Sequence, residues 1–230
     1  MAHVDPGFLE GRLVEISALV RHLLRDALSA LETGDAEIAQ RVIDSDDEID
    51  RRCLALDSDA EILLVGKAVA GRDIALLLAA MRIGRNLERM ADQCVTIAKL
   101  VQAGGNDEPG SEEVRELLQQ MGQRAERMLE VATDALARRD ADRARGLDDL
   151  DNLVDELNRT VIARVLELGG DHSRREWGLR MVLVARGIER IADNVVDIGE
   201  QVFYVVTGDL REFNDASHTE PPDEHPGEAA

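Results

Sequence analysis

The sequence predicts an all-α protein built from two tandem antiparallel three-helix bundles. Apolar residues recur with the period of a helix along most of the 230 residues, and Leu, Ala, Arg and Glu dominate the composition. One motif also occurs twice, as RNLERMADQC from Arg85 and as RGIERIADNV from Arg186. The two copies lie 101 residues apart, counted from Glu88 to Glu189, which indicates a duplicated unit.

The first half of the chain is predicted to hold three helices, over about residues 8–33, 35–64 and 73–103. Gly34 ends the first helix and Asp35 can cap the second, because these residue types favour those positions. The stretch VGKAVAG, residues 65–71, is the predicted turn before the third helix. GGNDEPG, residues 104–110, is the predicted linker, so that residues 1–103 make up the first bundle.

The second half repeats this plan with predicted helices over about residues 111–137, 140–168 and 173–206. Ser111 opens the first of these, Asp140 can cap the second, and SRRE from Ser173 is a capping box for the third. Short loops favour antiparallel neighbours. Residues 111–208 therefore form the second predicted bundle, and the polar residues 209–230 are expected to be an acidic disordered tail.

The composition argues against several classes of function. The formal net charge of -20 should repel nucleic acid, and 2% aromatic residues leave no stacking platform for single strands. No apolar stretch approaches the ~20 residues that cross a bilayer, and the N-terminus does not resemble a signal peptide. We expect a cytoplasmic protein with no direct nucleic-acid binding and no membrane insertion. Cys53 and Cys94 are then reduced, with Cys94 a thiol of the core.

Pairs of acidic residues lie one helical turn apart at the edge of the predicted core or inside it. Glu88 and Asp92 border the apolar stripe of the third helix, and Asp46 and Asp50 fall within the apolar arc of the second. The second half repeats both pairs, as Asp151 with Asp155 and Glu189 with Asp193. Carboxylates on an apolar face must be paired, bound to metal or protonated, because burying a bare charge is prohibitive.

Two explanations for these carboxylates remain open. Arg85, Arg89, Arg186 and Arg190 lie at helical spacing from the acids and can form internal ion pairs. Alternatively, the four acids of each half converge between two helices of their bundle and bind a metal. Oxygen ligands suit hard cations such as Mg²⁺, Mn²⁺, Ca²⁺ or Fe³⁺. Both can hold at once, since arginines can pair with the outer oxygens.

The sequence favours a protein that is not an enzyme. The Glu-x-x-His motifs of di-iron oxidase bundles are missing, and the five histidines lie away from both motifs. No phosphate-binding GxxxxGK[ST] loop occurs, and no nucleophile with a partnered base can be named.

The sequence resembles the PhoU family of bacterial phosphate-signalling proteins. The resemblance rests on ERMAD and ERIAD, each with an arginine three residues before its glutamate, and on the acid pairs of the preceding helices. It covers roughly residues 9–208. Two departures are Thr96 and Asp197, at a place where many members have asparagine, so we also consider Asp197 a candidate metal ligand of the second half.

The resemblance implies a regulator rather than a catalyst. It implies carboxylate-bound metal ions (iron, zinc, manganese, magnesium or calcium) and negative regulation of phosphate uptake and of the phosphate-starvation response. It also implies that the protein couples a phosphate ABC transporter to a sensor histidine kinase, and we expect a homodimer. The alternative is a metal-binding helical-bundle accessory protein of another transporter or of intracellular phosphate metabolism.

Overall fold

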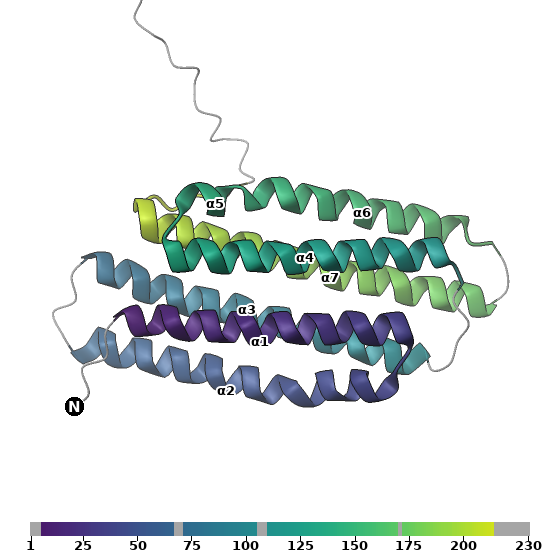
Figure 1. Ribbon diagram of the computed structural model, residues 1–230, viewed down its shortest axis with the longest axis horizontal. Coiled ribbons are helices and arrows are strands. Elements are labelled where there is room, and N and C mark those ends of the chain that lie inside the picture. The colour runs from purple at the N-terminus through teal and green to yellow at the C-terminus, as the bar shows by residue number, and fades with distance from the viewer. Residues whose placement is uncertain (1–5, 67–70, 105–109, 170–171, 214–230) are drawn as a thin grey trace, which may run out of the picture.

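The computed structural model describes residues 6–66, 71–104, 110–169 and 172–213, and helices account for nearly all of them. The helices are α1 (Pro6–Thr33), α2 (Ala36–Gly66), α3 (Gly71–Gly104), α4 (Glu112–Arg138), α5 (Ala141–Arg145), α6 (Leu147–Glu167) and α7 (His172–Thr207). They run along one common axis and give the molecule an elongated shape (Figure 1). The predicted all-α fold is confirmed.

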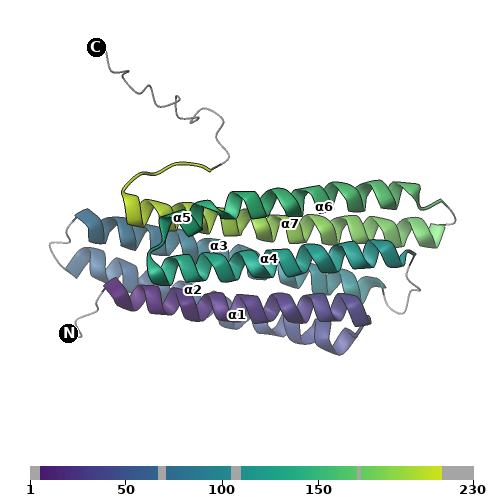
Figure 2. The same cartoon turned by 45° about the horizontal axis from the view of Figure 1, so that its top comes forward.

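The helices form two antiparallel bundles that lie side by side. α1, α2 and α3 make the first bundle, and α4, α7 and the pair α5 and α6 make the second (Figures 1 and 2). The bundles meet where α3 packs along α7 and α1 packs along α4, while α2 and α6 lie on the outside. In the first bundle, α1 packs on one side of the groove between α2 and α3. In the second bundle, α4 packs in the same way on one side of the groove between α6 and α7. The outer sides of both grooves therefore open on the same face of the molecule.

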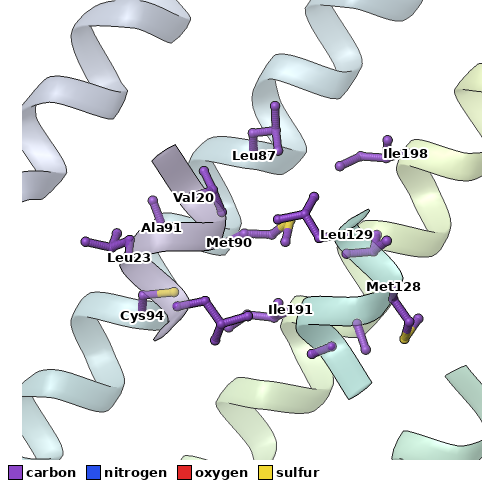
Figure 3. Close-up of a cluster of buried hydrophobic side chains, with 14 of the residues drawn as sticks. Val20, Leu23, Leu87, Met90, Ala91, Cys94, Met128, Leu129, Ile191 and Ile198 are labelled. Atoms are coloured by element: carbon purple, nitrogen blue, oxygen red, sulfur yellow. The ribbon is translucent and has the colours of Figure 1, made fainter. Parts of the chain in front are cut away.

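A single hydrophobic core runs through both bundles. At its centre, Val20 of α1, Met90 of α3, Leu129 of α4 and Ile191 of α7 point toward one another (Figure 3). All four side chains are almost completely buried. Cys94 belongs to the same cluster, as predicted for a thiol of the core. The two copies of the unit therefore share their apolar surface instead of keeping separate cores.

Side-chain caps fix several helix ends where the sequence predicts them. Asp35 Oδ1 accepts hydrogen bonds from the backbone N–H groups of Glu37 (2.8 Å) and Ile38 (3.2 Å). Gly34 takes a positive φ of 69°, which glycine adopts without strain. Ser111 Oγ and Asp140 Oδ1 cap α4 and α5 in the same way.

Two boundaries differ from the prediction. The helix expected over residues 140–168 is interrupted at Gly146, which separates the short α5 from α6. α7 begins at His172, so Ser173 lies inside the helix instead of capping it. Residues 67–70 of the predicted turn and 105–109 of the predicted linker lie outside the described residues.

The start of the predicted tail packs against the second bundle. The ring of Phe213 meets that of Phe203 edge to face at 5.8 Å, and the backbone N–H of Phe213 donates to Glu200 Oε1 at 2.9 Å. Residues 214–230 of the tail lie outside the described part of the chain. Among the helices that the structure describes, none is long and apolar enough to cross a membrane.

Candidate functional site: two carboxylate seams

The acids of the first half come together along the groove between α2 and α3. Cys53 Sγ of α2 donates a weak hydrogen bond to the backbone oxygen of Gly84 on α3, which shows the register in which these antiparallel helices pack. This register places Asp46 and Asp50 opposite Glu88 and Asp92. We call these four residues (Asp46, Asp50, Glu88 and Asp92) the first seam.

Burial and repulsion from neighbouring carboxylates make Asp46 and Asp92 of the first seam hold their protons more tightly. Burial, and then the charges of Asp50 and Asp92, raise the pKa of Asp46. Burial, and then Glu88 and Asp50, raise the pKa of Asp92, and the Lys99 ammonium opposes the rise in both residues. Asp46 Oδ1 is buried without a hydrogen-bond partner among the described residues. The carboxylates of α2 and α3 therefore lie close enough to repel each other.

The acids of the second half meet between α6 and α7, and two of them, Asp151 and Glu189, are more deeply buried than their counterparts in the first half. Asp151 and Asp155 lie on α6 and face Glu189 and Asp193 on α7; we call these four residues the second seam. Burial, and then the charges of Asp193 and Asp155, raise the pKa of Asp151 to about 7. Asp151 is 8% exposed and Glu189 7%. Within the described residues, Asp151 Oδ1 and Glu189 Oε2 are buried without a hydrogen-bond partner.

The arginines satisfy only part of this acidity. Arg85 Nη1 donates to Glu88 Oε2 at 2.5 Å and to Oε1 at 2.8 Å, and Arg186 forms the equivalent ion pair with Glu189 Oε1. Arg190 lies near enough to oppose the raised pKa of Glu189. Two of the four predicted arginines, Arg85 and Arg186, thus pair with the glutamates, while one oxygen each of Asp46, Asp151 and Glu189 remains for another partner.

Asp197 and Arg89 lie together in a different place, between the bundles. Both line a groove of about 650 Å³ between α3 and α7, which residues 210–212 border at one end. Burial and the charge of Asp193 raise the pKa of Asp197, and Arg89 opposes the rise. The structure therefore places Asp197 near Asp193 of the second seam and also beside Arg89 of the first bundle.

Sequence reasoning missed charged residues that extend the seams. Asp57 of α2 lies near Glu88, and Asp148 of α6 lies near Asp151. Helical spacing is a signal that could have found them, because Asp57 follows Asp50 by two turns and Asp148 precedes Asp151 by three residues. Lys99, at the other end of the first seam, and Glu200, at the same end of the second seam as Asp148, were also missed.

The donor set fits a hard cation, although the side chains do not yet converge on one point. Buried carboxylate oxygens without partners are the ligands that Mg²⁺, Mn²⁺, Ca²⁺ and Fe³⁺ prefer. Yet among the described residues, no three His, Cys, Asp or Glu side chains stand ready to hold a metal ion. Binding a cation would require their side chains to rotate toward a common centre. His22 and His172 pair with acids outside both seams, Asp26 and Glu176.

Together, the fold and the seams define an internally duplicated helical protein in which each copy of a three-helix unit carries four carboxylates on one outer face. The comparison with known proteins agrees with this class. The PhoU domain matches the chain twice, over residues 13–101 and 118–202. The chain belongs to the PhoU family.

Relatives resemble the chain over most of its length. A phosphate-specific transport system accessory protein, PhoU homolog 1 of Mycobacterium tuberculosis, is 29% identical over 88% of this chain and 91% of its own. The PhoU homolog of Pseudomonas aeruginosa is 28% identical over 87% and 83%. The crystal structure of the phosphate transport system regulatory protein PhoU from Streptococcus pneumoniae superposes with a TM-score of 0.82, at 27% identity over 90% of this chain and 97% of that one.

Proposed function

We propose that this protein is a regulatory accessory protein of phosphate transport. The observation that carries the proposal is the family membership of both halves, since relatives named as phosphate-transport accessory or regulatory proteins align over most of the chain. In this role it couples the state of a phosphate ABC transporter to a sensor histidine kinase and represses phosphate uptake when phosphate is plentiful. It works by binding, not by turnover of a substrate.

The second part of the proposal is that each seam holds metal. Asp46, Asp50, Glu88 and Asp92 are the ligands of the first site, and Asp151, Asp155, Glu189 and Asp193 those of the second. The unpartnered buried oxygens of Asp46, Asp151 and Glu189 support this, because a cation would stabilise the charge that burial and repulsion now penalise. A bound cation neutralises the carboxylates and links α2 to α3, or α6 to α7.

We further propose a cytoplasmic location and a homodimer. The net charge of -20 favours partners with basic surfaces. Leu54, Ile62 and Val65 are exposed along α2, which supports a protein-binding surface on the first bundle.

The regulatory role is tested in a strain that lacks the gene. Phosphate-starvation genes should be expressed at high phosphate in the deletion strain and repressed again when the wild-type gene is returned. If their expression at high phosphate is the same with and without the gene, the role in phosphate signalling is wrong. An accessory role for another transporter would then gain support, and co-purification with that transporter's subunits would establish it.

The metal sites are tested separately, by elemental analysis of protein purified without a histidine tag or added metal. The double substitution Asp50→Asn with Asp92→Asn should lower the metal content of the first seam and leave the second largely intact. Wild-type protein without bound metal, whose thermal stability a chelator leaves unchanged, would show that the arginines alone balance the seams.

A further inference from the structure

The two seams carry opposite charges at one equivalent position. Lys99 on α3 and Glu200 on α7 each follow the glutamate of their motif by 11 residues, Glu88 in the first copy and Glu189 in the second. The ammonium of Lys99 lies near enough to Asp46 and Asp92 to lower the pKa of both. At the matching place on α7, burial and the charges of Asp197, Glu212 and Asp148 raise the pKa of Glu200, and a hydrogen bond from the backbone N–H of Phe213 lowers it. The first seam therefore has a positively charged side chain at this position, and the second seam has a negatively charged one.

A second equivalent position, on α2 in the first seam and on α6 in the second, is also more acidic in the second seam. Asp148 precedes Asp151 by three residues, whereas Ile43 precedes Asp46 by three. Asp148 Oδ1 is buried and, among the described residues, has no hydrogen-bond partner. The second seam thus has Asp148 and Glu200 where the first has an alkyl group and an ammonium, while the first has Asp57 where the second has Ile162.

Burial strengthens this contrast. Asp151 and Glu189 are each more than nine-tenths buried, and each has one oxygen without a partner that is shielded from water. Their counterparts in the first seam, Asp46 and Glu88, are only half-buried, whereas Asp92 and its counterpart Asp193 are both exposed. Charges repel more strongly where water is excluded, so the second seam gains more when a cation enters it.

We propose that the two seams are unequal metal sites, and that the second seam, extended by Asp148 and Glu200, takes up a divalent cation before the first, in which Lys99 serves as a built-in counter-ion. This inference rests on the metal binding proposed above. A cation that enters the first seam meets the positive charges of Arg85 and Lys99, whereas one that enters the second meets Arg186 and Arg190 but also the buried, unpartnered oxygens of Asp151 and Glu189.

Titration of the metal-free full chain with Mn²⁺ tests the proposal, with free Mn²⁺ followed by its paramagnetic resonance signal. The wild type should bind in two steps of different affinity. Asp193→Asn should remove the tighter step and Asp92→Asn the weaker one. Glu200→Gln should weaken the tighter step, and Lys99→Gln should strengthen the weaker step, each by about tenfold, because each changes one unit of charge beside a divalent cation.

Two variants control for other effects of these substitutions. Lys99→Arg keeps the charge and should leave the weaker step near its wild-type affinity. Arg127→Gln removes an exposed cation from α4, far from the seams, and should change neither step. Circular dichroism of each variant checks that its helices are intact.

The outcomes separate this inference from the proposal beneath it. Two steps of equal affinity, or a weaker step that Lys99→Gln leaves unchanged, would overturn the inequality while keeping both metal sites. Tight binding that Asp92→Asn abolishes would reverse the assignment of the seams. A wild-type chain that takes up no Mn²⁺ would refute the metal sites, and this inference with them.

Discussion

At the scale of single residues, the main feature is the carboxylates that are buried beside others of their kind. Asp151 is the clearest example of such a carboxylate. Burial is the largest cause that raises its pKa, and the charges of Asp193 and Asp155 follow. This arrangement destabilises the folded state whenever Asp151 is ionised and no cation is bound. The seams are therefore places where protons and metal ions compete.

The raised pKa of Asp151 predicts a pH dependence of stability in the metal-free protein. Because its pKa is about 7 in the folded chain and about 4 when unfolded, the folded state binds the proton more tightly. The resulting stability is fully present below pH ~4 and is lost as the pH rises to ~7, by on the order of 2 to 4 kcal/mol. Urea unfolding with a chelator at several pH values measures this loss.

Asp151→Asn should flatten that profile between pH 4 and 7, since an amide cannot ionise. Glu116→Gln, an exposed change on α4, should leave the wild-type slope in place. A slope that persists in Asp151→Asn would assign the effect to other acids of the seam.

At the scale of elements, the break at Gly146 matters because it lets α5 and α6 pack closely on α7. Gly199 of α7 lies at this contact, and a Cβ there would come within 2.6 Å of Leu147 Cδ1 and 3.1 Å of the backbone oxygen of Ala144. A side chain can move away, but a helix backbone moves only together with its neighbours. Position 199 therefore requires glycine for the close approach of two helices.

Gly199→Ala should consequently destabilise the protein, by about 1 to 3 kcal/mol, through overpacking. Gly11→Ala in the second turn of α1 is the matched control, since nothing lies within 4 Å of a Cβ at that position. The control should stabilise the protein by roughly 0.5 to 1 kcal/mol, because alanine favours helix over glycine. Thermal unfolding followed by circular dichroism compares the two, and equal effects would contradict the role of close packing at Gly199.

Local signals were enough to predict most elements, because period and caps are properties of neighbouring residues. Asp35, Ser111 and Asp140 begin helices as expected. The break at Gly146 was missed, since a single glycine in a long helical pattern is tolerated as often as it ends a helix. The proximity of Asp46 to Asp92 could be predicted from the antiparallel three-helix arrangement. The contact of Arg89 with the groove at Asp197 was not, because it depends on how the two bundles dock.

At the scale of the whole molecule, the shared core makes the two bundles one unit. Met90 of α3 and Ile191 of α7 face each other across the boundary between the bundles (Figure 3). Neither bundle could separate without exposing these side chains to water, at a cost of about 1.5 to 3 kcal/mol for each large one. The two halves should therefore unfold together.

Two probes test this cooperativity. Circular dichroism reports on all helices, while Trp177, the single tryptophan, reports on the second bundle alone. Their urea transitions should coincide, and in Ile191→Ala both should shift together, with stability lower by about 2 to 5 kcal/mol. Separate transitions would show that the bundles fold independently despite their common core.

Because the two copies share one core, equivalent positions inside the core must hold similar residues, whereas equivalent positions outside it can differ. Cys94 and Val195, which face inward at matching places, are both small and apolar, since each must fit into the shared core. Lys99 and Glu200 lie only a turn or so further along the same helices, and they have opposite charges. The two copies of the duplicated unit thus keep the same fold. Their exposed positions can nevertheless differ in charge, so that the copies become chemically different.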